Sequence, residues 1–433
     1  MKSPWPALAL LALAACQQPT LPDVEGDPLF DGGDGLTASF DRVVSGEITE
    51  DLTLDAEEPW ILDGRVVVTD GATLTVEAGA TVYGNPVTRG TLVIGQGSRI
   101  VAEGTAAQPI VFTSPRARGA RRAGDWGGLV LNGYAPVNNC EGTPCTAQGE
   151  AETGTYGGSD PEDDSGVLRY VRVEFAGALV DTENELNGIS FQGVGSGTAV
   201  DYIQLHETSD DGIEFFGGTV DVRHVVITGA GDDSLDWTYG WRGRAQYVAI
   251  QPHPGSGDRG IEADNSGSSM DALPRSAPVI ANLTMAGHEG SGIGMNLRRG
   301  TGAGIFNSIL TGYDVCLDID DDPTWANGLT DPETLSGDLI VAGSWLDCPA
   351  LGSTSTWNAV TVEDFLAMNQ ANVYQAPLLA DGQDADSPEW TPTAAGTDTG
   401  ALALEDEFFE ITDFVGAIGD DDWTTGWTQS GTD

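Results

Sequence analysis

Six short segments of this chain share one pattern: a small residue, then a large aliphatic anchor, then an apolar residue two positions after the anchor. They are Gly188–Phe191, Gly212–Phe215, Ser234–Trp237, Gly260–Ala263, Gly292–Met295 and Cys316–Ile319. Their anchors recur at steps of 24, 22, 26, 32 and 24 residues. A period in the low twenties, with loops absorbing the excess, is typical of stacked β coils. Because a β-sandwich would not keep this anchor six times, the pattern predicts a right-handed parallel β-helix.

Short runs of Val, Ile, Leu and Thr extend the pattern toward the N-terminus, and glycine and aspartate separate them. Examples are Arg65–Val68, Thr73–Val76, Thr91–Ile94 and Ile110–Thr113. With coils spaced by about 4.8 Å, residues 40 to 320 would make about a dozen coils and a rod of about 55 Å. We therefore expect a β-helix over residues 40–349.

Residues 350–433 lose the pattern, and we expect an irregular C-terminal cap there. This part contains one helix signature, in which Thr361 precedes Asp364 by three residues and the apolar run Phe365–Met368 follows. Such spacing is typical of a capping box at a helix N-terminus. The cap is expected to end in the aromatic segment Trp423–Trp427.

The chain begins with one positive charge at Lys2, an apolar run and Cys16. This is the layout of a secretory leader, and it is too short to span a bilayer. The ending Leu13–Cys16 resembles a bacterial lipobox, in which the cysteine is acylated after cleavage; a plain secreted leader is the alternative. We predict a lipoprotein signal peptide over 1–16 and a flexible tether over 17–39, rich in Pro, Gly and acids.

Four cysteines remain after Cys16, and an exported chain with an even number of cysteines favours disulfides over a zinc site. Four cysteines allow three pairings. We expect Cys140 to pair with Cys145 and Cys316 to pair with Cys348, because each pair is adjacent in the order of cysteines along the chain.

The chain carries 67 acidic and 18 basic residues, which gives a formal net charge of −49. Its only lysine is Lys2, inside the predicted leader. Binding to nucleic acid or to an anionic membrane surface requires a basic face, so both classes are excluded. Such acidity instead suits calcium, a cationic partner or a salty medium.

Several sequence blocks resemble exported β-helix surface lipoproteins of Gram-negative bacteria. They are GTAAQPIVFTSP, DWGGLVLNGYAPVN, SGVLRYVRVEFAG, ELNGISFQGVGSGT, DDGIEFFGGTVDVRHVVITGAGDDSLDW and the closing FVGAIGDDDW and TTGW. In these lipoproteins a residue other than Asp after the acylated cysteine, here Gln17, favours the outer membrane. The resemblance implies a β-helix fold and an outer-membrane location, either exposed on the surface or facing the periplasm. It implies no reaction.

Carboxylates recur beside the anchors. The position after each anchor holds Ser190, Glu214, Asp236, Glu262, Gly294 and Asp318, and the position two before holds Asn187, Asp211 and Asp233 in the first three coils. Side chains alternate across a strand, so we expect this column on the outside, facing solvent. Stacked like charges raise their pKa values or bind a cation. We predict calcium on Asp211, Glu214, Asp233, Asp236 and Glu262. Solvated turn residues are the alternative.

A second function class is glycan cleavage. The segments Ser209–Ile213, Gly231–Ser234 and Gly287–Gly290 partly resemble motifs of polygalacturonase-type hydrolases, which share the β-helix fold. The resemblance would make Asp211, Asp232 and Asp233 the acid and base of an inverting displacement, with His288 beside them. His288 lies two coils beyond Asp233 instead of one, and no Arg-Ile-Lys motif follows.

Trp237 and Trp241 lie next to the acidic column and are candidates for stacking on sugar rings, although packing in the core is the commoner role of such aromatics. Taken together, the sequence predicts a lipid-anchored, acidic β-helix that acts as a binding or surface-structural module. Its expected cofactor is calcium, and its expected partner is a glycan or a surface protein.

Overall fold

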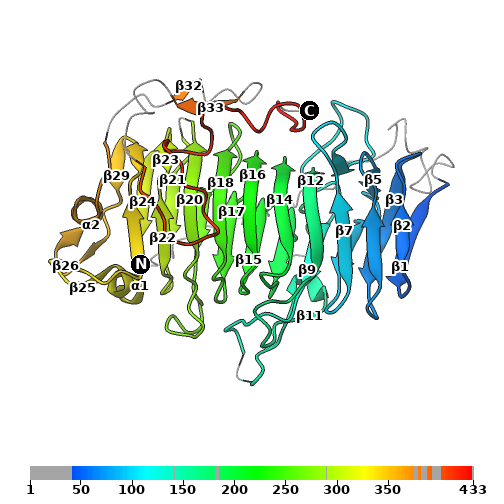
Figure 1. The fold of residues 1–433 in the computed structure, drawn as a ribbon, viewed down its shortest axis with the longest axis horizontal. Helices are drawn as coiled ribbons and strands as arrows, with labels where there is room; N and C mark the ends of the chain where they lie inside the picture. The colour runs from blue at the N-terminus through cyan, green and yellow to red at the C-terminus, as the bar shows by residue number, and fades with distance from the viewer. Residues whose placement is uncertain are drawn as a thin grey trace, which may run out of the picture.

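The computed structural model describes residues 41–431 apart from 141, 181–184, 289, 375–378, 382–387 and 393–400. Within these residues, 25 strands form one continuous parallel sheet. The sheet winds as successive coils of a right-handed β-helix, stacked along the long axis of the molecule from β1 (Val43–Ile48) to β29 (Ala350–Gly352) (Figure 1). The predicted fold class is confirmed. The predicted leader, its Cys16 and the tether lie outside the described residues.

Each coil contributes to three walls, and strands in one wall pair from coil to coil. The first wall contains β2 (Leu52–Leu54), β4 (Thr73–Val76), β7 (Arg99–Glu103), β22 (Ala303–Phe306), β27 (Leu339–Ala342) and the first halves of β12 (Gly166–Glu174), β14 (Ala199–His206), β16 (Asp221–Thr228), β18 (Arg244–Gln251) and β20 (Val279–Ala286). The second wall contains the other halves of these five strands with β5 (Thr81–Gly84), β8 (Ile110–Thr113), β23 (Ile309–Thr311) and β28 (Trp345–Asp347).

The third wall carries the predicted anchors. It contains β6 (Thr91–Ile94), β9 (Gly128–Asn132), β13 (Ile189–Gln192), β15 (Ile213–Phe216), β17 (Leu235–Thr238), β19 (Arg259–Ala263), β21 (Ile293–Leu297), β24 (Val315–Ile319) and β29. At the N-terminal end, β1 and β3 (Trp60–Val68) each span the second and third walls.

Shorter elements lie outside this sheet. They are β10 (Ala147–Gln148), η1 (Glu150–Glu152), β11 (Thr155–Tyr156), α1 (Asp322–Gly328), β25 (Leu329–Asp331), β26 (Thr334–Leu335), β30 (Thr356–Trp357), β31 (Val360–Thr361), α2 (Val362–Met368), β32 (Leu379–Asp381) and β33 (Glu389–Pro392).

The anchors stack in register inside the third wall. Ile189 pairs with Ile213, which pairs with Leu235, and all three are buried. The predicted alignment is wrong at the next-to-last coil, where Ile261 pairs with Met295 and not with Ile293. The loop before β21 is longer there, and the fully buried side chain is Met295, so the register is fixed by burial and not by the preceding glycine.

Aromatic rings fill the prism beside these anchors. The Phe215 ring stacks on Phe191, with centroids 5.3 Å apart, and on Trp241, with centroids 3.8 Å apart. Trp237 and Trp241 are both 0% exposed and belong to the main hydrophobic core. Because no ligand reaches rings that point into the prism, the predicted sugar-stacking role of these two tryptophans is wrong.

The C-terminal end of the β-helix is closed by α1, α2 and the small hairpins around them (Figure 1). Helix α2 begins with the predicted capping box, since Thr361 Oγ1 accepts from the Asp364 N–H and the Asp364 carboxylate accepts from the Thr361 N–H. The predicted disulfides Cys140–Cys145 and Cys316–Cys348 are both present.

Residues 401–431 do not cap the end, contrary to the expected role of this segment. They run back along the outside of the first and second walls (Figure 1). Asn282 Nδ2 donates to the Gly416 carbonyl at 3.2 Å, and Arg172 Nη1 donates to the Trp427 carbonyl at 3.1 Å. The tail covers the corner between these walls, where Trp423 and Trp427 pack edge-on against the Tyr202 ring. Burying this apolar surface stabilises the attachment of the tail.

Candidate cation site

The in-register stacking of the third wall brings carboxylates from different coils together on its outer face. Glu214 pairs with Asp236, and Asp236 pairs with Glu262. The turn that precedes each of these strands adds Asp211 and Asp233, which also follow one another from coil to coil. The predicted carboxylates are thus neighbours in space, although they differ in burial and in partners.

Asp211, Glu214 and Asp236 form one cluster, which we call the acidic trio. One oxygen from each carboxylate lies within 4.8 Å of one oxygen from each of the others. Asp211 is 6% exposed and Glu214 is 9% exposed. The predicted solvent-facing column is therefore wrong here. The reason is the insertion that carries η1, which folds back over the third wall and is tied there by Arg65 Nη2 donating to the Ala151 carbonyl at 2.6 Å.

The hydrogen bonds of the trio leave several oxygens without donors. Asp211 Oδ1 accepts from the Asp233 N–H at 2.9 Å, and Glu214 Oε2 accepts from Asn187 Nδ2 at 2.8 Å. Asp236 Oδ1 and Asn187 Oδ1 are buried and receive no hydrogen bond. Among the described residues, no arginine or histidine forms an ion pair with the trio. Arg298 is near enough to Asp236 to offset part of its charge, but it does not form an ion pair with it. Buried carboxylate oxygens with no donor and no paired counter-charge are strongly destabilised unless they bind a proton or a cation.

Burial is the main cause of the altered acidity here, and repulsion between neighbouring carboxylates is the second. Together they raise the pKa values of Asp211, Glu214 and Asp236 well above the ordinary range. The same two causes raise the pKa of Asp233 to about 8 and the pKa of Glu150, in η1, to about 8.

A second cluster lies at the turns beside the trio. Asp232, Asp233 and Asp258 each place one oxygen within 4.8 Å of the other two. Asp232 and Asp258 are exposed, whereas Asp233 is 3% exposed and its Oδ1 receives no hydrogen bond. This cluster contains the two remaining aspartates of the predicted hydrolytic set, and Asp232 also closes a third group with Asp210 and Asp211.

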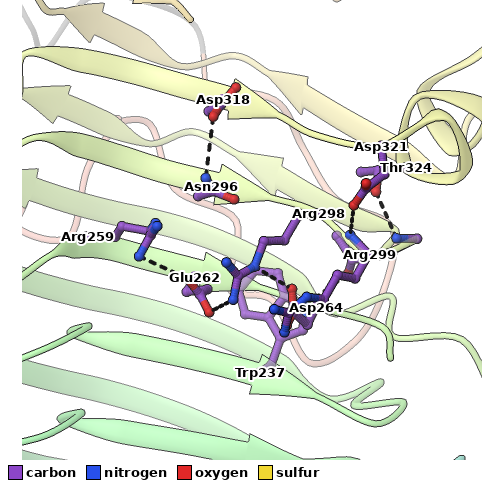
Figure 2. A network of polar contacts seen from close by, with 12 residues as sticks. Trp237, Arg259, Glu262, Asp264, Asn296, Arg298, Arg299, Asp318, Asp321 and Thr324 are labelled. Carbon is purple, nitrogen blue, oxygen red and sulfur yellow. Dashed lines mark hydrogen bonds and ion pairs between the residues drawn. The ribbon is translucent and has the colours of Figure 1, made fainter. Parts of the chain in front are cut away.

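Arginines neutralise the next part of the wall. Figure 2 shows Arg259 and Arg298 pointing toward Glu262, and Arg298 and Arg299 pointing toward Asp264. Arg259 Nη1 lies 3.0 Å from Glu262 Oε1, and Arg299 Nη1 lies 2.6 Å from Asp264 Oδ2. Glu262 was predicted as a calcium ligand. The structure instead places it in ion pairs with two guanidinium groups, so it is not available to a cation in the way the trio is.

His288, the fourth residue of the predicted hydrolytic set, lies in the turn after β20. Its Nε2 lies 3.0 Å from the His253 carbonyl oxygen. None of the three clusters of candidate ligand atoms among the described residues includes it. The turn that carries Asp258 separates His288 from Asp233 along the stack, as the two-coil spacing in the sequence indicates.

Sequence reasoning missed Glu150 and the Arg259, Asp264, Arg298 network. Glu150 lies in a loop with no periodic signal, and its charge acts directly on Glu214. The signal for the network was present, since Arg298 and Arg299 directly follow β21 and Asp264 directly follows β19. Reading one turn further along each coil would have found these charges on adjacent coils.

Residues 46–395 match the sequence family described as pectate-lyase-like β-helix domain. Because the match spans more than half of the chain, the protein belongs to this family. The chain matches no curated protein and no solved structure. In the described part of the chain, no helix combines the length and the apolar character that crossing a membrane requires.

The raised pKa values predict the pH dependence of stability in the presence of a chelator. In the folded protein the pKa of Asp233 is raised to about 8 and the pKa of Asp210 to about 7, above unfolded values of about 4. The folded protein then binds more protons than the unfolded chain, so stability is highest below about pH 4 to 5 for these groups and falls as the pH rises to about 8. Urea unfolding should show a loss of about 2 kcal/mol or more between pH 5 and 8.

The matched control is the triple variant Asp211→Asn, Glu214→Gln, Asp236→Asn. Its unfolding free energy should depend less steeply on pH over the same range, because three of the titrating groups are gone. A wild-type free energy of unfolding that is flat or increases from pH 5 to 8 would show that the cluster does not hold protons.

Proposed function

We propose that this protein is a lipid-anchored β-helix of the outer membrane that acts as a binding or surface-structural module and holds calcium at the acidic trio. The observation that supports the cation most strongly is the packing of three carboxylate oxygens within 4.8 Å of one another, with none of the described guanidinium groups paired to them. Two oxygens bound to one calcium ion at about 2.4 Å are at most about 4.8 Å apart, so the spacing suits a single ion.

The donor chemistry favours calcium over a transition metal. Asp211, Glu214 and Asp236 offer only oxygen, and the orphaned Asn187 Oδ1 and the Ser190 hydroxyl lie on the same wall. Oxygen donors in a tolerant geometry, completed by water, are what calcium prefers, whereas zinc and copper favour nitrogen and sulfur. In the proposal a bound ion replaces protons on the trio and joins the β15 coil to the β17 coil.

The proposed role of the bound cation is therefore, first of all, to stabilise the structure. A cation held by two neighbouring coils opposes the repulsion that the stacked carboxylates create, and it fixes the outer face of the third wall. The exposed Asp232 and Asp258 lie beside it and are open to solvent, where a glycan or a surface protein would make contact. The anchor at Cys16 and the outer-membrane location rest on the lipobox and on the family resemblance of the sequence.

Calcium is expected to stabilise the wild-type protein. At a calcium concentration of 100 times Kd, binding adds about 2.7 kcal/mol, and for a chain of this size that corresponds to a rise in Tm of about 3 °C. Differential scanning calorimetry at pH 7.5, with chelator and then with excess calcium, measures the shift. The triple variant Asp211→Asn, Glu214→Gln, Asp236→Asn should lose it.

Glu262→Gln is the matched control, because Glu262 lies in the same column but is held by Arg259 and Arg298. This variant should keep the calcium shift even if its Tm is lower overall. An equal calcium shift in the triple variant and the wild type would place the ion elsewhere. No shift in the wild type would overturn the calcium proposal.

The lipid anchor has its own test. When the full-length gene product is expressed in a Gram-negative host with labelled fatty acid, the wild type should carry the label and partition into detergent. Cys16→Ser should carry no label and remain in the aqueous phase, because the acylated thiol is missing. Label retained by Cys16→Ser would contradict the proposed attachment site.

Glycan cleavage is the second candidate, and one observation favours it: the half-open cluster in which exposed Asp232 and Asp258 flank buried Asp233. The family description, which refers to pectate lyase, points the same way. An inverting hydrolase needs carboxyl groups separated by about 6.5 to 9.5 Å to admit a water molecule. The closer packing of oxygens here, within 4.8 Å, suits that mechanism less well than it suits a cation.

The discriminating assay measures new reducing ends released from neutral and acidic polysaccharides, with and without calcium. We expect no release from the folded wild type. Release that disappears in the double variant Asp232→Asn, Asp233→Asn, with unchanged circular dichroism, would assign catalysis to this cluster and replace the module proposal.

A further inference from the structure

A pocket lies on a different side of the prism from the trio, at the corner between the first and second walls. Its floor is formed by His224 and Tyr247, from β16 and β18, and its volume is about 770 Å³. Its sides are formed by the C-terminal tail, which contributes the apolar side chains of Phe414, Ile418 and Trp423. None of its lining residues belongs to the candidate cation site.

The tail makes this pocket by doubling back on itself. Its first arm is held by the side chain of Gln246. Gln246 Nε2 donates to the Glu410 carbonyl, and Gln246 Oε1 accepts from the Glu410 N–H, both at 2.9 Å. Its bend is fixed by the Asn307 carbonyl, which accepts from the Gly416 N–H at 2.8 Å. Its second arm returns to the corner, where the Trp423 ring meets His224 edge-on with centroids 5.0 Å apart. The two arms therefore stand on either side of a fixed floor.

The floor presents oriented polar atoms. Tyr247 Oη donates to Glu410 Oε2 at 3.1 Å, which turns this carboxylate toward the pocket floor. His224 Nδ1 lies 2.7 Å from Asp201 Oδ1. A ring nitrogen that faces a carboxylate carries a proton, so Nδ1 is the atom that His224 uses to bond Asp201.

The charged residues that line the rim are acidic, although the Arg223 guanidinium, outside the lining, lies 3.8 Å from Glu410 Oε1. Asp413, Asp420 and Asp421 line the pocket with Glu410, and all four side chains are exposed or partly exposed. Among the lining residues that the structure describes, none is an arginine. Carboxylates gathered around a concave surface with apolar sides concentrate the negative potential there and attract cations while repelling anions.

We propose that this pocket binds a primary ammonium group on a short apolar stem. The ammonium has three donors, which match the Glu410 carboxylate and the aspartates of the rim, and the stem lies against Phe414, Ile418 and Trp423. The tail already receives cations in this region, since the guanidinium groups of Arg223 and Arg244 lie 4.3 and 4.7 Å from the centre of the Phe408 ring.

The ligand comes from another molecule. The only lysine of the chain is Lys2, so no described segment of this protein supplies an ammonium side chain. Two sources share the required chemistry, namely a free alkylamine and a lysine side chain of a partner protein. The inference does not rest on the proposed calcium site, because the two sites share no residue.

The test is isothermal titration calorimetry of the full-length protein in detergent at pH 7. The free amine is hexylamine, and the lysine source is a short peptide with one lysine and blocked ends. Hexanol and hexanoic acid have the same stem without the positive charge. We expect at least one of the two ammonium probes to bind, and the tighter one identifies the source. Neither hexanol nor hexanoic acid should bind comparably.

The variant that tests the site is Asp413→Asn, Asp420→Asn, Asp421→Asn. All three side chains are exposed, so folding should be unaffected, and affinity should fall about fivefold to tenfold, given the modest strength of each exposed pair. The control is Glu47→Gln, Glu50→Gln, Glu77→Gln, which removes the same charge from exposed positions on the first coils and should leave affinity unchanged. Absence of ammonium binding, or equal loss in both variants, would overturn the proposal.

Discussion

Parallel backbone hydrogen bonding from coil to coil is the interaction on which the rest of this structure depends. It places equivalent residues of successive coils directly above one another, with about 4.8 Å between strands. Inside the prism this alignment is favourable, because Ile189, Ile213 and Leu235 bury apolar surface against each other. Outside the prism the same alignment stacks Glu214 on Asp236, and their repulsion has to be balanced by something else.

The wall balances this repulsion differently along its length. Around Glu262 and Asp264 the counter-charges are three arginines from neighbouring turns, held in a dense network (Figure 2). Around Glu214 no arginine in the described part of the chain is paired, and the insertion bearing η1 shields the carboxylates from water. A proton or a cation is the remaining means of neutralisation there. This difference between adjacent coils is what singles out the trio among 67 acidic residues.

The C-terminal tail, residues 401–431, covers aromatic side chains on another face of the prism. At the corner between the first and second walls, residues such as Tyr202 and His224 have a left-handed backbone conformation with positive φ. Their rings stack with centroids 4.1 Å apart. Their outer edges are covered by Trp423 and Trp427. Because the tail turns back before it completes this cover, it leaves the acidic pocket, and the two candidate sites lie on different sides of the prism.

The sequence by itself determined the β-helix, the cysteine pairs, the Thr361 cap and the alignment of Glu214 with Asp236, because each follows from short-range periodicity or spacing. It did not determine burial. Only the tertiary structure decided that Glu214 is covered and that Glu262 is held by arginines. The cover depends on the path of the η1 insertion, which is set by contacts distant in sequence, and the arginines reach Glu262 from the start of β19 and from the turn after β21; neither outcome has a periodic signal.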